Sequence, residues 1–347
     1  MLEIKDVHKS YVSFELGPLD LNVGDEVLSV LGPSGCGKTT LLSVIAGIIQ
    51  PDGGTITLNG KNLNGLPPED RGTVLVFQDG ALFPHMTARE NIEYAADSME
   101  VVKNLSETLE ISGILDQKAD TLSGGEGKRV ALARSIAADP DALLLDEPLA
   151  NLDTPIKRRL RSEMRDLLSS LDIPVIYVTH DQHDATVIGD RIAIMNDGEV
   201  HQVSTPTEVF ERPETRFVAS FTGNVNLFPA RIKRKDGENG LLLEWSDNLI
   251  EAPDYNYDTD EDVWFCIRPE YVMIADGRVK DRKNVLEGEI RNRVFEGDGY
   301  TLHFVPRGLD QTIQIKLATP VYERLGLAER DRIEISLKKE AIHVLER

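Results

Sequence analysis

The segment from Gly32 to Thr39 constrains the fold more than any other part of this sequence. It reads Gly-Pro-Ser-Gly-Cys-Gly-Lys-Thr and fits the pattern G-x-x-x-x-G-K-[ST]. The apolar stretch Glu26–Leu31 before it predicts a strand, and Lys38–Ile48 after it predicts a helix. Because a strand before and a helix after are the context that this pattern requires, we interpret it as a phosphate-binding loop rather than a structural turn. The chain is therefore expected to be an α/β protein built on a largely parallel sheet.

Two side chains at the end of this loop suit a nucleoside triphosphate. The glycines allow backbone N–H groups to surround a β-phosphate, and the helix N-terminus adds the positive end of its dipole. Lys38 is expected to reach the β- and γ-phosphate oxygens, and Thr39 to supply an oxygen ligand to Mg²⁺. The predicted contacts to the nucleotide in this segment are Gly32, Pro33, Ser34, Gly35, Cys36, Gly37, Lys38, Thr39 and Thr40.

A second part of the site follows the apolar run Ala142–Leu145, which predicts a buried strand that ends in two carboxylates. Asp146 is expected to hold Mg²⁺ through water. Glu147, one residue further on, is placed to orient and deprotonate an attacking water. An apolar run before Asp-Glu is a weak pattern alone, but beside a phosphate-binding loop it predicts a hydrolytic site.

Three further polar residues stand next to predicted elements. Gln78 and His180 directly follow apolar strands, and Asp153 lies in the turn before a predicted helix. Strand ends in a wound sheet converge on the ligand crevice, so each residue is placed to contact phosphate, metal or water. Taken singly, Gln78 and Asp153 are better explained as surface turn residues, and His180 is equally well explained as a plain polar residue at a strand end. The convergence of all three is what supports a role.

The first 222 residues alternate short apolar strands with helical segments, which is typical of a wound sheet. Residues 90–118 predict a small helical insert, and the turns around residues 51–60 predict an antiparallel hairpin layer. The predicted strands are Glu26–Leu31, Thr55–Leu58, Thr73–Phe77, Ala142–Leu145, Pro174–Val178 and Arg191–Met195. The predicted helices are Lys38–Ile48, Gly125–Ala138, Pro155–Leu171 and Asp181–Ile188.

After residue 222 the pattern changes to short runs with apolar residues on one face, such as Thr312–Leu317 and Arg332–Leu337. Turn-prone segments separate these runs. They predict a small all-β domain, either a barrel or two barrel halves. We therefore expect two domains, 1–222 and 223–347.

The formal net charge of −21 comes from 38 basic and 59 acidic residues. This excess argues against a nonspecific grip on nucleic acid or an anionic membrane surface, because both attract cationic proteins. Arginine outnumbers lysine, and we interpret the acidity as adaptation to concentrated salt; an ordinary acidic soluble protein is the alternative. Apolar runs are too short to span a bilayer, and charges near the start argue against export. Cys36 and Cys266 cannot form a disulfide framework or a zinc site.

The segment Leu122–Glu126 reads Leu-Ser-Gly-Gly-Glu and precedes a stretch with helically spaced apolar residues. Ser123 is expected to be the N-cap of this helix. Gly124 and Gly125 then expose the first helical N–H groups as an anion site. By itself, this pattern is equally that of an ordinary helix cap.

In order and context, these features together resemble the ATP-binding subunit of ATP-binding-cassette transporters over roughly residues 1–222. The resemblance implies ATP hydrolysis with Mg²⁺, and Tyr11 then stacks on adenine. The motifs that carry it are the glycine loop, Gln78, Leu122–Glu126, Leu143–Pro148, Asn151–Asp153 and Thr179–His180. The catalytic residues it implies are Lys38, Gln78, Glu147 and His180. The metal ligands it implies are Thr39, Gln78 and Asp146.

The same resemblance implies a homodimer that closes head to tail over two nucleotides. It also implies integral-membrane permease subunits as partners, with this subunit at the cytoplasmic face of the membrane. The segment Leu82–Ile92 is similar to the corresponding segment of the importer subgroup. Two departures stand out: Glu126 replaces the usual Gln and adds a negative charge, and the insert between Gln78 and Leu122 is short. The residues that complete the partner's ATP site are Ser123, Gly124, Gly125, Glu126 and Asp153.

The C-terminal part resembles the accessory β-domain of importer ATPases at Gly223–Pro229 and Cys266–Glu270. Lys283–Ile290 and the ending Glu340–Leu345 are similar to the small molybdate-binding domain, although Asp281-Arg282-Lys283 replaces the usual Ser-Ala-Arg. This favours an importer of molybdate or tungstate, served by an extracellular or periplasmic oxyanion-binding protein. The C-terminal domain then either binds the oxyanion or is a purely structural dimerising barrel.

The sequence is also compatible with other functions of the cassette. Importers of sulfate or thiosulfate, ferric iron and sugars share the same cassette. A soluble cassette ATPase acting on ribosomes or DNA would carry two cassettes or long coiled coils and a basic stripe. An exporter would commonly carry fused membrane helices. The sequence has one cassette and an acidic balance, which favours an importer subunit.

Overall fold

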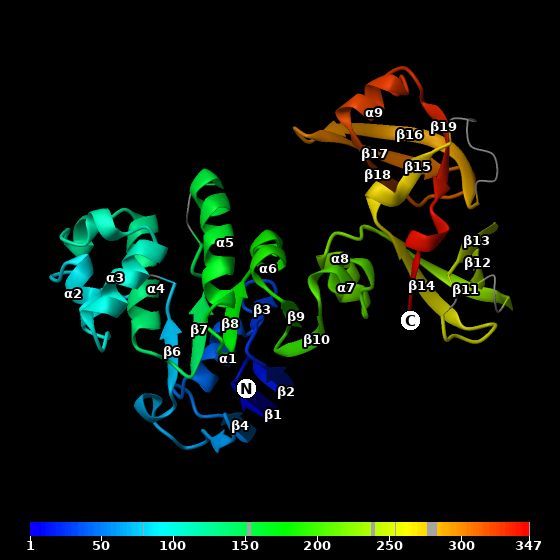
Figure 1. Cartoon of the computed structure of the whole chain (residues 1–347). Coiled ribbons are helices and arrows are strands. Elements are labelled where there is room, and N and C mark those ends of the chain that lie inside the picture. The colour runs from blue at the N-terminus through cyan, green and yellow to red at the C-terminus, as the bar shows by residue number, and fades with distance from the viewer. Residues whose placement is uncertain (79, 151–153, 237–239, 254, 276–282, 347) are drawn as a thin grey trace. The chain divides into compact units, whose positions relative to one another are not determined.

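The computed structural model of this chain describes residues 1–78, 80–150, 154–236, 240–253, 255–275 and 283–346, without the side chains of 154–156 and 236. It divides into two compact units, Met1–Pro206 and Thr207–Arg347 (Figure 1). The topology of the two units confirms the predicted fold class, a wound α/β unit followed by a small all-β unit. None of the described helices is long and apolar enough to cross a bilayer.

The first unit contains a six-stranded sheet in the order β10-β9-β3-β8-β7-β6. All of its strand pairs are parallel except the β9–β10 hairpin. Strands β3, β7 and β8 are buried along their whole length, as the continuous apolar runs predict. The strands are β3 (Val27–Leu31), β6 (Thr73–Val76), β7 (Ala142–Asp146), β8 (Val175–Thr179), β9 (Arg191–Asn196) and β10 (Glu199–Ser204).

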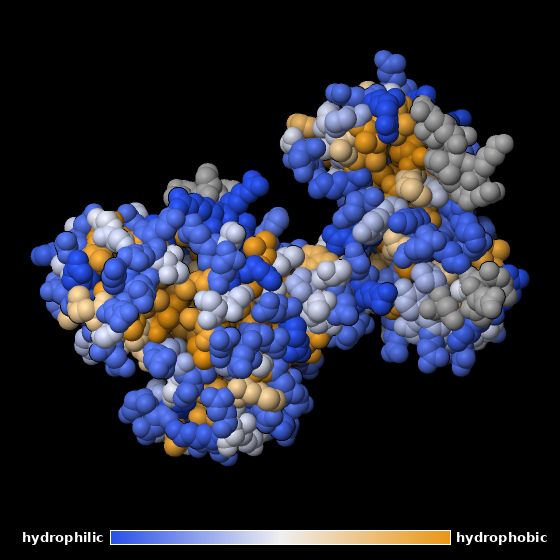
Figure 2. Space-filling model, viewed as in Figure 1, coloured by the Kyte–Doolittle hydropathy of each residue, from blue (hydrophilic) through white to orange (hydrophobic). Residues whose placement is uncertain are grey.

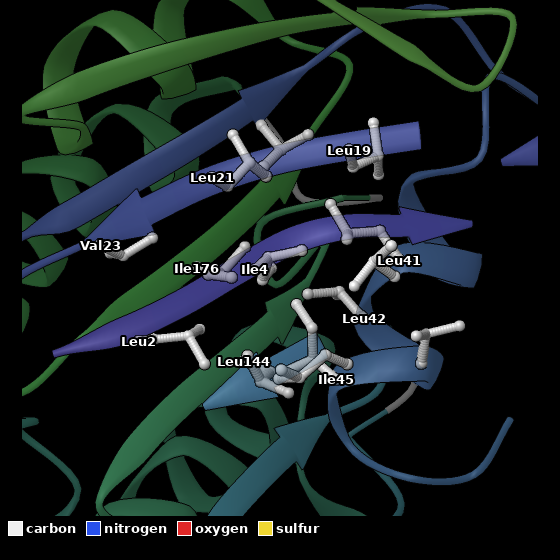
Figure 3. Close-up of a cluster of buried hydrophobic side chains, with 14 of the residues drawn as sticks. Leu2, Ile4, Leu19, Leu21, Val23, Leu41, Leu42, Ile45, Leu144 and Ile176 are labelled. Carbon is white, nitrogen blue, oxygen red and sulfur yellow. The ribbon is translucent and has the colours of Figure 1, made fainter. Parts of the chain in front are cut away.

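An antiparallel sheet in the order β2-β1-β4-β5 forms a second layer of this unit, where the turns predict a hairpin layer. Its strands are β1 (Leu2–Ser10), β2 (Glu15–Val23), β4 (Gly53–Leu58) and β5 (Lys61–Asn62). A shared core joins this sheet to helix α1 (Lys38–Ile45) and the larger sheet, and Figure 3 shows these side chains pointing toward one another. They include Leu2, Ile4, Leu19, Leu21, Leu41, Leu42, Ile45, Leu144 and Ile176.

Six α-helices are described in the first unit: α1 (Lys38–Ile45), α2 (Ala88–Glu93), α3 (Met99–Thr108), α4 (Gly124–Ala137), α5 (Thr154–Ser169) and α6 (Gln182–Ile188). Helix α1 ends at Ile45 rather than Ile48, because Gly47 takes a left-handed φ of 82°. Helices α2 and α3 form the predicted insert and pack on α4.

The second unit consists mainly of two five-stranded antiparallel sheets, in the orders β13-β12-β11-β14-β20 and β15-β19-β16-β17-β18. One apolar core joins them, which fits the predicted barrel-like domain. The first sheet comprises β11 (Asn226–Asp236), β12 (Gly240–Trp245), β13 (Asn248–Ala252), β14 (Asp262–Ile267) and β20 (His343–Glu346). The second comprises β15 (Val272–Ile274), β16 (Val285–Phe295), β17 (Gly299–Pro306), β18 (Ile313–Ala318) and β19 (Arg332–Leu337), with helix α9 (Thr319–Arg324) after β18.

The division between the units falls before the sequence-based boundary at residue 222. Helices α7 (Pro206–Glu211) and α8 (Arg216–Phe221) follow the end of the wound sheet. Ala219 of α8 packs with Cys266 and Leu345, which lie on β14 and β20. These apolar contacts are why α8 belongs to the compact all-β unit.

Candidate functional site

The glycine loop and Lys38 form the centre of the site. Gly35 and Gly37 have φ values of 83° and 105°, a left-handed conformation that only glycine adopts without strain. A Cβ on Gly37 would lie 2.6 Å from Cζ of Phe14, so the loop also needs glycine for space. The buried Lys38 ammonium group donates hydrogen bonds to the Gly32 and Pro33 carbonyl oxygens, both at 2.8 Å. The loop thus holds one cation among its own backbone groups, where a phosphate would approach.

Asp146 lies beside this loop at the end of β7. Its carboxylate accepts a hydrogen bond from the Thr39 hydroxyl group at the start of α1. Burial raises the pKa of Asp146, the Thr39 hydrogen bond opposes this shift, and the neighbouring charge of Glu147 adds to it. A hydroxyl and a carboxylate are oxygen ligands, and a buried carboxylate gains from a nearby cation, so this pair fits Mg²⁺.

Glu147 and His180 face each other across the ends of β7 and β8. The Glu147 N–H donates to the Val178 carbonyl at 3.0 Å, which continues the ladder between the two strands. Glu147 then takes a left-handed φ of 47°, which turns the chain away from the sheet. Its Oε1 lies 2.8 Å from Nδ1 of His180. The structure therefore brings the predicted base and the predicted histidine into direct contact.

Ser123 is the N-cap of α4, as its position predicts. Its hydroxyl group and backbone N–H donate to Oε2 of Glu126 at 2.6 and 2.8 Å, and the Glu126 N–H donates back to the hydroxyl at 3.4 Å. The two hydrogen bonds from Ser123 lower the pKa of Glu126. Glu126 is therefore an ionised member of a capping box, where the sequence suggests only an extra charge near a partner's nucleotide.

Gln78 is exposed just beyond the edge strand β6. It lines the same hollow as Ser123, Gly124 and Lys128. The sheet order separates β6 from the loop-bearing β3 by β7 and β8. The structure thus groups Gln78 with the start of α4. The role of Gln78 as a metal ligand stays a prediction.

Tyr11 is 45% exposed near the glycine loop. Its ring centre lies 6.3 Å from that of Phe14, the residue that packs on Gly37, and 6.0 Å from the Lys9 ammonium group. This leaves a ring face near the loop for the predicted stacking on adenine. Asp153, predicted to act on the partner's site, lies outside the described residues.

Sequence patterns miss several residues that shape this site. Lys128 of α4 donates to the Ala150 carbonyl in the segment after Glu147. Arg134 donates to the Gly80 and Ala81 carbonyls at 3.1 and 3.0 Å, which fixes the segment after Gln78. These carbonyls lie 22, 54 and 53 positions away in the sequence, so no local spacing signals them.

Comparison with known proteins places this geometry in a family. Residues 18–150 match the ABC transporter family and residues 265–345 match the TOBE domain. A xylose/arabinose import ATP-binding protein of Haloferax volcanii is 36% identical over 94% of this chain and 88% of its own. A spermidine/putrescine import ATP-binding protein of Clostridium novyi is 36% identical over 87% of each chain. An sn-glycerol-3-phosphate import ATP-binding protein of Cereibacter sphaeroides is 34% identical over 99% of this chain and 97% of its own.

Solved structures agree with these matches. The dimeric ATP-binding cassette MJ0796, bound to ADP and Pi, has a TM-score of 0.53 and 30% identity, and covers 59% of this chain and 99% of its own. The structure of cbiO1 from Clostridium perfringens has a TM-score of 0.56 and 27% identity, and covers 61% of this chain and 90% of its own.

The phosphate-binding loop, the strand-end carboxylates and the wound sheet define a nucleotide-hydrolysing domain, an ATPase of the cassette type. The chain belongs to the ABC transporter family, as the ATP-binding subunit of an importer with a C-terminal TOBE domain.

Proposed function

We propose that this subunit hydrolyses ATP to energise a separate permease that imports a small organic solute, with a sugar as the first candidate. The carrying observation is the match to the xylose/arabinose import protein, which extends over 94% of this chain and so includes both units. A polyamine is the second candidate, because a spermidine/putrescine import protein reaches the same identity. In this proposal the subunit works as a homodimer bound to the permease at the cytoplasmic face of the membrane.

For the chemical step, we propose that Glu147 is the general base. Its carboxylate accepts a proton from the attacking water, whose oxygen bonds to the γ-phosphorus as the bond to the β-phosphate oxygen breaks. The 2.8 Å contact of Oε1 with Nδ1 of His180 fixes the carboxylate. Because the Glu147 carboxylate only accepts, Nδ1 of His180 donates to it, and the contact of Nε2 with the γ-phosphate requires that Nε2 also carry a proton to donate.

The glycine loop binds the phosphates in this proposal. The Lys38 ammonium group exchanges its two carbonyl partners for the β- and γ-phosphate oxygens, which are stronger, charged acceptors. Thr39 and Asp146 would hold Mg²⁺, with Gln78 as a further predicted ligand, and the bound ion would supply positive charge to the phosphates. The start of α4 from a second copy completes the site, through Ser123, Gly124, Gly125 and Glu126, together with Asp153.

Two observations make molybdate or tungstate a weaker candidate than an organic solute. The relatives named above import sugars, polyamines and a glycerol phosphate. In addition, the Asn284 side chain in the molybdate-like segment is buried and bonded to backbone groups. It accepts from the Glu251 N–H at 2.7 Å and donates to the Glu251 and Leu337 carbonyls at 2.8 and 3.1 Å. Because the Asn284 amide already makes these bonds between strands, its N–H groups are not available to bind an oxyanion.

Reconstitution with the cognate permease and solute-binding protein tests this assignment. ATP hydrolysis by the proteoliposomes is measured with xylose, spermidine or molybdate in the presence of the binding protein. We expect xylose to stimulate turnover severalfold, and spermidine stimulation would instead select the second candidate. Stimulation by molybdate alone would overturn the organic-solute assignment, while Glu147→Gln controls for ATPase contaminants.

We also infer that the acidic excess is an adaptation to concentrated salt. Hydrophilic residues cover most of the face of each unit seen in Figure 2. Many ion pairs are exposed, such as Arg89 with Asp116 at 3.1 Å, so they add little stability and are readily screened. The net charge of −21 then opposes folding mainly at low ionic strength, where self-repulsion is strongest.

A further inference from the structure

A partly buried group of four charged residues joins helices α5 and α6, which lie side by side (Figure 1). We name Lys157, Arg161, Asp181 and Asp184 the α5–α6 ion cluster. The Lys157 ammonium nitrogen lies 2.6 Å from Oδ2 of Asp181 and 3.0 Å from Oδ2 of Asp184. The Arg161 guanidinium group bonds to the same two carboxylates, at 3.0 Å to Oδ2 of Asp181 and through Nε to Oδ1 of Asp184. Each cation thus binds both anions.

The cluster is partly shielded from solvent. The Asp184 side chain is 2% exposed, those of Lys157 and Arg161 are 16% and 15% exposed, and that of Asp181 is 28% exposed. Burial disfavours the charged form of Lys157, but its hydrogen bonds to Asp181 and Asp184 and their charges outweigh burial and raise its pKa. Ion pairs in such surroundings are screened weakly by salt, and breaking one partner leaves the other buried and uncompensated.

The cluster fixes the backbone on both sides of His180. Asp181 follows His180 directly and is the N-cap of α6, where its Oδ1 accepts from the N–H groups of His183 and Asp184 at 2.8 and 3.2 Å. The Asp181 N–H donates in turn to the Thr179 hydroxyl at 3.0 Å. That hydroxyl donates to Oδ2 of Asp184 at 3.4 Å. The residues immediately before and after His180 are therefore held by the same carboxylates that Lys157 and Arg161 bind.

We propose that Lys157 and Arg161 are positioning residues for His180, which they hold against Glu147 through Asp181 and Asp184. Neither cation contacts the reacting atoms. Both come from α5. This inference rests on the proposed role of His180.

A purely structural tie between two helices is the competing explanation, and the two differ in what a substitution changes. Lys157→Met is expected to lower kcat about tenfold while KM for ATP changes less than about twofold, because a small misplacement of a catalytic group affects the chemical step most. Lys157→Arg is expected to recover most of the lost kcat, because it keeps a cation that reaches both carboxylates. A structural tie alone predicts unchanged kcat in any variant that folds.

The matched control is Arg159→Met on the same helix. Arg159 is 64% exposed and pairs with Glu110 and Glu163, so its removal takes away a cation from α5 without touching the cluster. We expect Arg159→Met to keep wild-type kcat. Equal kcat values for Lys157→Met and Arg159→Met would overturn the proposal.

Asp181→Asn keeps the inference testable if Lys157→Met does not fold. Asparagine is as good an N-cap as aspartate, so α6 keeps its cap while the anion is lost. We expect Asp181→Asn to lower kcat about as much as Lys157→Met, and wild-type kcat in a folded Asp181→Asn protein would contradict the inference.

The double variant His180→Ala/Lys157→Met separates this inference from the proposed function. If Lys157 acts through His180, the double variant has the same kcat as His180→Ala alone. Multiplicative losses would overturn the positioning role and leave the role of His180 intact. Wild-type turnover by His180→Ala would instead overturn the proposed function of the histidine.

Discussion

Replacement of Arg71 by methionine is expected to destabilise the first unit by about 2–4 kcal/mol. Arg71 is 1% exposed. Its Nε donates to the Leu66 carbonyl at 3.0 Å, and its Nη1 donates to the Val44 and Ile45 carbonyls, each at 2.9 Å. The last two carbonyls lie at the C-terminal end of α1, the helix whose first residue is Lys38. The guanidinium group thus binds the negative end of that helix dipole.

The magnitude follows from these three hydrogen bonds. The Val44 carbonyl keeps the Gly47 N–H as a donor at 3.2 Å, so the substitution leaves two carbonyls without one. A buried carbonyl left without a donor costs about 1–3 kcal/mol, so two of them cost about 2–6 kcal/mol. Part of this is offset, because burial of the guanidinium group, which lowers the pKa of Arg71, is itself unfavourable and methionine removes it. Methionine also fills much of the same apolar space. The balance is the lower half of that range.

Urea unfolding of the full chain measures this effect with an internal reference. Both tryptophans, Trp245 and Trp264, lie in the second unit, so their fluorescence reports that unit, while far-UV circular dichroism reports the helices of the first. We expect Arg71→Met to shift the dichroism transition to lower urea and leave the fluorescence transition in place. Arg89→Met, which removes an exposed pair with Asp116, should change stability by less than about 1 kcal/mol. A loss below about 1 kcal/mol for Arg71→Met would refute this account of the Arg71 hydrogen bonds.

Three other perturbations have defined outcomes. Asp146→Asn should raise the stability of the ATP-free protein at pH 7.5, because burial raises the pKa of Asp146 and makes its ionisation unfavourable. Wild type loses stability as pH rises through that raised pKa, so the two proteins should converge in acid, and a stability gap that does not change with pH would contradict this. Glu126→Ala should lower the free energy of unfolding by about 1 kcal/mol, because it removes the capping box with Ser123. Glu126→Gln should keep most of that free energy, because glutamine can also form the box. Equal losses in the two variants would show that the capping box contributes nothing. Removal of salt should lower the melting temperature and the ATPase rate together, and a melting temperature independent of salt would refute adaptation of the acidic surface.

The fold was predictable where residue type and spacing agree. The strands β3 and β7 are continuous apolar runs next to a glycine loop and an Asp-Glu pair, and both form as predicted. The predicted strands do not include β2, which carries in its middle Gly17-Pro18, a pair typical of turns. Proline is tolerated there since β2 is the edge strand of its sheet, where a missing N–H costs no ladder bond. Edge position is a tertiary property that no local pattern contains.

The sequence predicts the site residues that lie at strand ends, but it does not predict the residues that hold the surrounding elements in place. Asp146, Glu147 and His180 follow neighbouring parallel strands, so the topology alone brings them together. Lys157 and Arg71 act on partners 24 to 27 positions away, across helix packing that only the structure defines.

The most direct test of the central claim is ATP turnover by Glu147→Gln. Glutamine keeps the shape of the side chain and removes its ability to accept a proton. We expect this variant to bind MgATP with wild-type affinity, to release phosphate at least about a hundredfold more slowly, and to accumulate as an ATP-bound dimer in light scattering. Wild-type phosphate release by Glu147→Gln would contradict the assignment of Glu147 as the base at this site.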